Sequence, residues 1–368
     1  MANSFRVATF NVENLFSRAR VFNKEDKRIG DEILEAIDEL NTLLRKKDYT
    51  SSIKSKIIKL YTKDDFDGEK LKYYVNIRED RGKLFKRSDF KIVGIKAKGS
   101  RSWDGAIEYI KAPFDEVVRE NTAKVIKAVN ADVACIVEAE SRPSLSNFNS
   151  AMLDSKKFKY NMLIDGNDRR GIDVGLMSNF PITNIITHIY DGTPRSRTFS
   201  RDCLEITVRL PNNEDLAILC NHLKSKGYGD TVKNNKRRKR QAEAIVDILG
   251  KYKLSQDNVI VAGDLNDTHN SNPLSPLMNK RYLYDVLELQ FGDDMSKRWT
   301  YHYNTFEQID YLLISKPLKD KFIKAGVERR GIYNLERLTN GVEKEFSTVT
   351  HWTNAASDHG GVFAEISL

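Results

Sequence analysis

A short apolar run near residue 260 constrains the fold more than any other stretch of the sequence. Residues 259–262 are apolar and mostly β-branched, which predicts a buried strand. The run ends in Gly263, Asp264, Leu265 and Asn266. Because side chains alternate along extended chain, Asp264 and Asn266 are expected to point the same way at the strand end. Taken alone, this ending is more typical of a polar turn.

Four other predicted strands finish, or begin, with side chains of the same kind. Residues 5–10 predict a strand followed by Asn11, and residues 132–140 predict a buried strand that closes in Glu138. Residues 215–220 lead into His222, while Asp358 and His359 stand just before the last strand. A buried carboxylate must be paired, protonated or bound to a metal. Five such sets favour one shared site over five unrelated turns.

The chemistry of these side chains favours a hard divalent cation. Carboxylates and amides are oxygen donors, which suit Mg²⁺ or Mn²⁺ rather than a soft metal. The sequence lacks Cys and His at zinc spacing, a Ser-His-Asp elbow, a Cys nucleophile and a phosphate-cradling glycine loop. A site of oxygen donors clamps a phosphoryl oxygen and allows in-line attack by an oriented water. The residues therefore predict metal-assisted phosphoryl chemistry.

Six motifs in chain order give the sequence a specific family resemblance. They are Thr9-Phe-Asn-Val-Glu-Asn-Leu15, Val137-Glu-Ala-Glu140, Asn221-His-Leu-Lys-Ser225, Gly263-Asp-Leu-Asn266, Gln308-Ile-Asp-Tyr311 and Ser357-Asp-His359. Together they resemble the endonuclease/exonuclease/phosphatase superfamily over residues 5–20 and about 115–368. The resemblance implies a four-layer α/β sandwich, in which two mixed sheets pack together and are flanked by helices. It also implies that Glu138 and Asn11 hold Mg²⁺ and that Asp358 binds or tunes the metal.

The same resemblance assigns catalytic roles to the remaining motif residues. It implies that Asp264 activates or orients the attacking water and that Asn266 steadies the phosphate. His359 would contact the scissile phosphate, with its tautomer fixed by Asp310. His222 would stabilise the phosphoryl oxygens or the leaving group.

Three departures from the family pattern are visible. Val137 stands where a Gln often precedes the metal-binding Glu, and Gly360 and Gly361 stand where a Pro often follows the His. No tyrosine matches the one that some abasic-site endonucleases place on the phosphate. His222 followed by Lys224 is closer to the deoxyribonuclease and sphingomyelinase pattern.

Three residues outside the metal and catalytic sets are candidate substrate contacts. Arg170 and Asp173 could bind a substrate phosphate, or Asp173 could simply pair with an arginine. Lys224, two residues after His222, indicates an anion pocket. The basic run at 236–240 is interpreted as a solvated helix start with one Arg or Gln turned inward.

Residues 21–113 differ in character from the rest of the chain. Residues 24–60 predict two amphipathic helices, and residues 71–77 and 91–97 predict strands. The segment is basic and contains interleaved aromatic residues: Tyr73, Tyr74, Phe85, Phe90 and Trp103. These suit phosphate contact and base stacking, although a solvated face around a small core accounts for them equally well. We expect one domain over residues 1–368, with 21–113 as an insertion of helices and short strands.

Composition bounds the partners and the compartment. Lys and Arg number 60 against 52 Asp and Glu, a net charge of +8, which weakly favours polyanionic partners. Three cysteines without a pairing framework predict buried free thiols in a reducing compartment. No signal peptide and no membrane-spanning run is visible, so the cytoplasm is the expected location.

The leading hypothesis is a Mg²⁺- or Mn²⁺-dependent phosphodiester hydrolase, and most specifically a nuclease that cleaves DNA or RNA. The basic balance and the basic aromatic segment favour nucleic acid as the partner. A phosphatase or phosphodiesterase of a small or lipid phosphate is the alternative, because the fold does not settle the substrate. A catalytically inactive nucleic-acid-binding regulator is a third hypothesis, which the complete set of motif residues disfavours.

Overall fold

The computed structural model describes residues 4–15, 19–23, 27–62, 64–66, 68–110, 116–168, 171–193, 196–226 and 231–368. The chain forms two compact units. The large unit comprises Met1–Phe16, Asp115–Lys226 and Asp230–Leu368, and the small unit comprises Ser17–Phe114 and Gly227–Gly229. Each unit has its own hydrophobic core.

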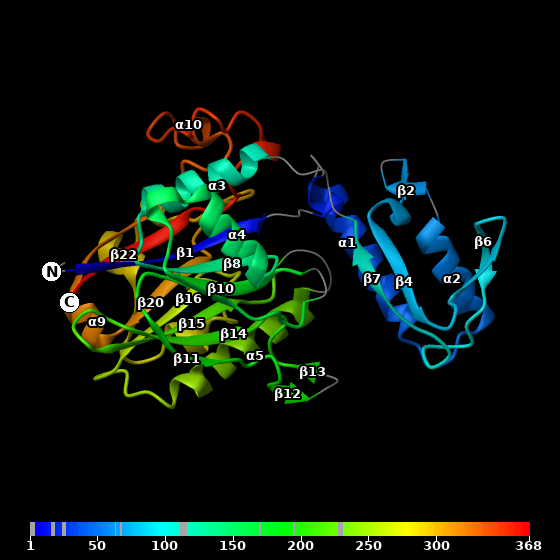
Figure 1. The fold of residues 1–368 in the computed structure, drawn as a ribbon, viewed down its shortest axis with the longest axis horizontal. Coiled ribbons are helices and arrows are strands. Elements are labelled where there is room, and N and C mark those ends of the chain that lie inside the picture. The colour runs from blue at the N-terminus through cyan, green and yellow to red at the C-terminus, as the bar shows by residue number, and fades with distance from the viewer. Residues whose placement is uncertain are drawn as a thin grey trace. The chain divides into compact units, whose positions relative to one another are not determined.

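Two six-stranded mixed sheets form the centre of the large unit (Figure 1). The first has the order β21 (Phe322–Glu328), β22 (Gly361–Ser367), β1 (Ser4–Leu15), β8 (Val133–Ala139), β10 (Asp173–Ser178) and β9 (Tyr160–Leu163). The second has the order β11 (Ile182–Ile186), β14 (Cys203–Arg209), β15 (Asp215–His222), β16 (Asn258–Asp264), β20 (Asp310–Ser315) and β17 (Leu283–Asp285). Strand β1 pairs with β8 in parallel, as does β15 with β16, and the other neighbours are antiparallel.

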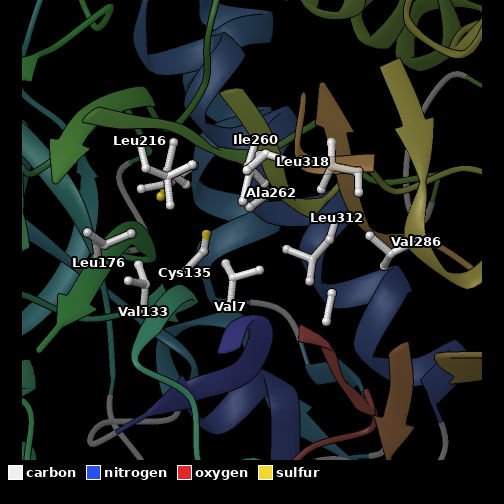
Figure 2. Packing of buried hydrophobic residues seen from close by; sticks show 14 of the residues in the cluster. Val7, Val133, Cys135, Leu176, Leu216, Ile260, Ala262, Val286, Leu312 and Leu318 are labelled. Carbon is white, nitrogen blue, oxygen red and sulfur yellow. The ribbon is translucent and has the colours of Figure 1, made fainter. Parts of the chain in front are cut away.

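The two sheets pack against each other through alternate residues of their strands. Val7 of β1 and Cys135 of β8 face Ile260 of β16 and Leu312 of β20 in one buried cluster (Figure 2). A fully buried aliphatic side chain contributes about 1.5–3 kcal/mol to folding, so this continuous interface is a principal source of the stability of the large unit. All three cysteines, Cys135, Cys203 and Cys220, are buried and form no disulfide, which confirms the expected free thiols.

Helices cover the outer faces of both sheets. The intervening residues of β1, such as Phe10, pack with α3 (Glu116–Val129) and α4 (Arg142–Met152). On the other side, Val259 and Val261 of β16 pack with α5 (Thr231–Leu249). The order helix, sheet, sheet, helix confirms the predicted four-layer α/β sandwich.

Several short elements complete the large unit. The helices are α6 (Ser275–Met278), α7 (Val286–Phe291), α8 (Met295–Arg298), α9 (Lys316–Asp320) and α10 (Leu335–Leu338), with 3-10 helices at Asp154–Lys156 and Trp352–Asn354. Two-stranded ribbons are formed by β12 (Gly192–Thr193) with β13 (Ser196–Arg197) and by β18 (Tyr301–His302) with β19 (Phe306–Glu307). In the described parts of the chain, no helix combines the length and the apolar character needed to cross a bilayer.

In its described residues, the small unit combines two α-helices with three antiparallel ribbons. Its helices are α1 (Lys27–Leu44) and α2 (Ser51–Thr62), preceded and followed by 3-10 helices at Arg20–Asn23 and Leu71–Tyr73. The ribbons pair β2 (Asp64–Phe66) with β3 (Glu69–Lys70), β4 (Val75–Arg81) with β7 (Asp104–Tyr109), and β5 (Phe85–Ser88) with β6 (Lys91–Ile95). The two predicted helices are confirmed. The strand expected at 71–77 starts only at Val75, because residues 71–73 form a 3-10 turn instead.

Most of the aromatic residues of the small unit belong to its core. Tyr74, Phe85 and Trp103 are buried, and Trp103 donates from Nε1 to the hydroxyl oxygen of Tyr49 at 3.0 Å. The interpretation of these three as stacking residues is therefore wrong, since their rings pack inside the unit. Tyr73 and Phe90 are the exceptions, because Tyr73 is 44% exposed and Phe90 is completely exposed.

A buried polar cluster lies at the edge of the second sheet, around His188. Its Nδ1 lies 2.9 Å from the Asp191 carboxylate and its Nε2 lies 3.1 Å from the Glu205 carboxylate. Asp202 accepts the backbone N–H of His188 at 2.7 Å, and the hydroxyl of Tyr252 donates to Glu205 at 2.6 Å. Nζ of Lys251 also lies 3.8 Å from Oε2 of Glu205. The hydrogen bond to Glu205 outweighs burial and, with Asp191, raises the pKa of His188 above its ordinary value.

Candidate functional site

The pairing of three strands in the second sheet aligns the predicted catalytic residues. His222 at the end of β15 lies opposite Asp264 of β16, and Asp264 lies opposite Asp310 of β20. The three side chains therefore occupy neighbouring positions across one edge of the sheet. In the first sheet, Asn11 of β1 lies opposite Val137, next to Glu138. Strand β1 continues beyond Asn11 to Leu15 through an irregular register, although a strand end at Asn11 was expected.

The backbone at this edge has conformations that fix the side chains. Gly263 has φ +132°, and a Cβ there would lie 1.9 Å from the carbonyl oxygen of Asn221. Only glycine allows β15 and β16 to approach so closely next to Asp264. Glu138 and Asn266 have φ of +67° and +56°, in the left-handed region that disfavours most residues. Such conformations persist when the surrounding structure holds them, and they concentrate at functional sites.

Asp264 is buried and accepts hydrogen bonds from two amide side chains. The Nδ2 groups of Asn11 and Asn266 donate to its Oδ2 at 3.1 Å and 3.0 Å. Its Oδ1 accepts the backbone N–H of Asn266 at 2.8 Å. Burial and the charge of Asp310 raise the pKa of Asp264 to about 7, against the opposing effect of His359. The site thus holds a carboxylate whose negative charge is incompletely compensated.

His359 and Asp310 form a buried pair. Nδ1 of His359 lies 2.7 Å from Oδ2 of Asp310, so the Asp310 carboxylate fixes the orientation of the imidazole ring. Burial lowers the pKa of His359, but the charge of Asp310 and the hydrogen bond to it outweigh burial and raise the pKa to about 10. His359 is therefore a cation at neutral pH. The ring of Tyr301 lies 4.9 Å from the His359 ring, centroid to centroid.

His222 links the carboxylates of the two sheets. Its Nε2 lies 3.6 Å from Oε1 of Glu138 and 3.5 Å from Oδ2 of Asp264. The structure therefore brings Asn11, Glu138, His222 and Asp264 together from four different strands. Asp358 is more open, with a side chain that is 41% exposed and an oxygen 3.7 Å from Nε2 of His359.

The donors fit a divalent cation. Ligand atoms of Asp264, Asp310 and His359 all lie within 4.8 Å of one another, and all three residues are buried. Oδ1 of Asp310 is buried without a hydrogen-bond partner in the described parts of the chain. Together with Glu138, the site contains three carboxylates against one buried imidazolium, an imbalance that a bound cation offsets. Two of the three clustered residues, Asp310 and His359, were predicted as catalytic, and the protonated His359 contributes positive charge to the site rather than a ligand atom.

The predicted substrate contacts differ in where they lie. Arg170 lies outside the described residues. Asp173 is buried and accepts the backbone N–H of Gly166 at 2.7 Å, and burial raises its pKa to about 7. The backbone of Lys224 is held by α5, where Arg238 donates to its carbonyl oxygen at 2.6 Å and Gln241 accepts its N–H at 2.8 Å. Arg238 and Gln241 are fully buried, which confirms the interpretation that α5 turns an Arg or Gln inward.

Two hydroxyl residues that the sequence did not single out support the site. Ser357 is buried, donates to the carbonyl oxygen of Asn11 at 2.7 Å and accepts the N–H of His359 at 3.0 Å. Thr300 Oγ1 accepts the N–H of Asp310 at 3.1 Å. Ser357 stands inside the Ser-Asp-His motif, so its position was a usable signal. Thr300 carried none, because a threonine beside a short strand is common in any fold.

Several solved structures are similar to this chain at low sequence identity. Truncated TDP2 of Caenorhabditis elegans is 17% identical, with a TM-score of 0.48 over 68% of this chain and 91% of that chain. An endonuclease/exonuclease/phosphatase from Beutenbergia cavernae is 20% identical, with a TM-score of 0.46 over 68% and 66%. TDP2 of D. rerio, in a complex with a single-strand DNA product, is 12% identical, with a TM-score of 0.48 over 68% and 92%. No curated protein sequence matches the chain.

The match of the sequence to a protein family is more informative than these structural similarities. Residues 113–359, well over half of the chain, match the Endonuclease/Exonuclease/phosphatase family. The matched region contains every predicted site residue except Asn11. The two packed sheets and the buried acidic and imidazole residues at their edge agree with this match. The chain belongs to the endonuclease/exonuclease/phosphatase family.

Proposed function

We propose that this chain is a Mg²⁺- or Mn²⁺-dependent phosphodiester hydrolase that cleaves nucleic acid. The observation that carries the proposal is the convergence of Glu138, His222, Asp264, Asp310 and His359 at one edge of the two sheets. Burying charges at this density costs free energy of folding. Such clusters are typical of binding and catalytic sites, where the charges have a function. Membership of a phosphoesterase family supports the reaction class.

The metal would be held by Glu138 and Asn11, with Asp358 nearby. The Oδ1 atom of Asn11 accepts the N–H of Glu13 at 3.0 Å, but an amide oxygen has a second lone pair for a cation. When bound, Mg²⁺ would polarise a phosphoryl oxygen and neutralise the charge that develops on it.

The other side chains of the site bind the phosphate and orient the attacking water. His359, held by Asp310 and cationic at neutral pH, binds a non-bridging phosphate oxygen. Asp264 orients the attacking water. Nδ2 of Asn266 also donates to the Leu223 carbonyl oxygen at 3.2 Å, which fixes the amide beside Asp264. In this position Asn266 steadies the phosphate. His222 stabilises the phosphoryl oxygens or the leaving group. Lys224 and Asp173 flank the site and contribute to substrate binding.

Charge favours a polynucleotide over a small phosphate ester as the substrate. The chain carries a net charge of +8, and residues 81–101 contain eight basic residues and one acidic residue. Binding to a polyanion releases counterions, so the affinity for nucleic acid should fall steeply with salt. A small phosphodiester would show only a shallow dependence. The slope of log affinity against log salt therefore separates the two substrate classes.

Substitution of Asp264 tests the site directly. We expect Asp264→Ala to abolish hydrolysis of a polynucleotide while the circular dichroism spectrum remains that of the wild type. Asp257→Ala is the matched control, because this exposed carboxylate precedes the same strand at its opposite end. Near wild-type turnover by the Asp264 variant would show that the assignment of the site is wrong. Turnover of a small phosphodiester, but of no polynucleotide, would instead favour a small or lipid phosphate as the substrate.

A further inference from the structure

The hairpin formed by β5 and β6 in the small unit has an unusual tip. Ser88 of β5 pairs with Lys91 of β6, so Asp89 and Phe90 alone form the turn between the strands. Both have positive φ, +46° and +62°. This pair of conformations defines the tight hairpin turn in which Asn-Gly is strongly preferred.

Phenylalanine is a poor choice for this position on folding grounds. A bulky L-residue is disfavoured in the left-handed region, because its Cβ approaches the following carbonyl oxygen. Burial of the ring does not compensate, since Phe90 is 101% exposed. The hairpin is anchored instead by Phe85, whose buried ring stacks on Tyr61 at 5.3 Å. A single exposed apolar residue is ordinary, but one in a strained turn implies a use outside folding.

The charges around Phe90 indicate what kind of partner the hairpin would meet. Lys86, Lys91 and Lys96 are all exposed, and none has an ion-pair partner among the residues that the structure describes. Arg87 is different, because it pairs with Glu79 at 2.8 Å and is held in place. Lys86 on β5, Lys91 at the start of β6 and Lys96 just after β6 thus carry free ammonium groups on either side of an aromatic tip.

We propose that the β5–β6 hairpin binds single-stranded nucleic acid, with Phe90 stacking on an unpaired base and the lysines contacting the flanking phosphates. An aromatic ring on a basic surface is the arrangement that binds single strands without sequence preference. A duplex fits less well, because its bases are already stacked and must be opened first. A bilayer fits less well too, because the Asp89 carboxylate would enter the interface beside the ring. The inference rests on the proposed nuclease function, since it specifies the form of polynucleotide that the chain holds.

Binding of a fluorescent oligonucleotide to the full-length chain tests the proposal. The measurement is anisotropy with a mixed-sequence single strand, and with the matching duplex, in EDTA so that no cleavage occurs. We expect Phe90→Ala to weaken single-strand binding at least about fivefold, the lower end of what one stacked base contributes. Phe90→Trp should retain binding. Val93→Ala is the matched control, because Val93 is 55% exposed on the same hairpin and offers no ring.

A glycine variant separates a binding role from a structural one. Phe90→Gly relieves the unfavourable backbone conformation. In a background in which Trp299 and Trp352 are replaced by Phe, the thermal midpoint reported by Trp103 should therefore stay the same or rise, while binding falls as in the alanine variant. A lower midpoint would show that the ring stabilises the small unit, and it would overturn the proposal.

Three other results would also overturn it: affinity of the Phe90→Ala variant within twofold of the wild type, an equal loss in the Val93 control, or an equal loss on duplex. So would binding to anionic phospholipid vesicles that depends on Phe90 while oligonucleotide binding does not. Because binding is measured without catalysis, an inactive wild-type enzyme would refute the proposed function and leave this test intact.

Discussion

Replacement of Arg298 by Met should destabilise the large unit strongly. Arg298 is fully buried at the end of α8. Its Nε donates to Oε1 of Gln308 at 2.9 Å, its Nη2 to Oδ2 of Asp285 at 3.0 Å, and its Nη1 to the carbonyl oxygen of Gly292 at 2.8 Å. Burial raises the pKa of Asp285 and Arg298 opposes that effect, so the two charges depend on each other.

Methionine fills similar space but supplies none of the three donors. The Asp285 carboxylate would remain buried with only the side-chain amide of Gln308 and the N–H of Leu287 as partners. Removal of one partner from a buried ion pair costs about 3–5 kcal/mol, because the other charge is left uncompensated. We therefore expect Arg298→Met to lower the free energy of unfolding of the large unit by about 3–5 kcal/mol.

Urea unfolding followed by tryptophan fluorescence measures this loss. In a Trp103→Phe background the signal comes only from Trp299 and Trp352, both in the large unit, so the small unit does not contribute. The control is Lys297→Met, because Lys297 precedes Arg298 but is 62% exposed and pairs with Asp294 at the surface. That variant should lose less than about 1 kcal/mol. An Arg298 variant no less stable than the control would refute the reasoning.

Three further substitutions test other parts of the structure. The pKa of His188 is raised above its ordinary value of 6.5, chiefly by Glu205, so protonated His188 stabilises the fold. That stabilisation is complete below about pH 6.5 and is lost as the pH rises through the raised pKa of His188. The urea concentration at the unfolding midpoint should therefore fall as the pH rises above about 6.5 in the wild type. In His188→Gln the midpoint should change less with pH. Gly263→Ala should lower the free energy of unfolding, measured in urea, by more than about 3 kcal/mol, or prevent folding, because the new Cβ would lie 1.9 Å from a backbone oxygen of Asn221. A midpoint equal to that of the wild type would contradict this geometry. Ser357→Ala should lower kcat about tenfold and lower the free energy of unfolding by about 1–3 kcal/mol, because two buried backbone groups of the site lose their partner; unchanged kcat would show that Ser357 does not support the site.

The sequence predicted individual strands and helices of the large unit because the relevant signals are local, whereas the four-layer arrangement was implied by the family resemblance. Apolar runs such as 259–262 are short and β-branched, and they alternate with amphipathic helices such as α3, so each element is visible without its neighbours. Helix α3, for example, spans Glu116–Val129, where apolar residues recur at helical spacing. The polar residues at the strand ends were also visible, because a carboxylate is rare after an apolar run.

The arrangement of the site required information that a linear pattern does not contain. The register between β16 and β20 decides that Asp310 lies opposite Asp264. A sequence pattern does not predict the pairing register of two strands that lie so far apart in the chain. The supporting residues were missed for the same reason. Arg298 looks like a surface residue in the sequence Met-Ser-Lys-Arg, and only its distant partners Asp285 and Gln308 account for its burial.

The small unit shows where composition misleads. A basic segment with interleaved aromatic residues predicts a binding surface and a small core equally well, because neither charge nor ring type reveals which face is buried. The structure assigns Tyr74 and Trp103 to the core and leaves Phe90 in solvent. The turn conformation at Phe90 then adds a signal that only the backbone provides.

Cleavage of nucleic acid with and without metal tests the central claim most directly. The substrates are supercoiled plasmid, single-stranded DNA and RNA, each with Mg²⁺ or Mn²⁺, beside an EDTA control and the Glu138→Ala variant. We predict metal-dependent cutting of at least one polynucleotide by the wild type, abolished by EDTA and by the substitution. Cutting that persists in EDTA or in the Glu138 variant, or no cutting of any polynucleotide, would contradict the claim.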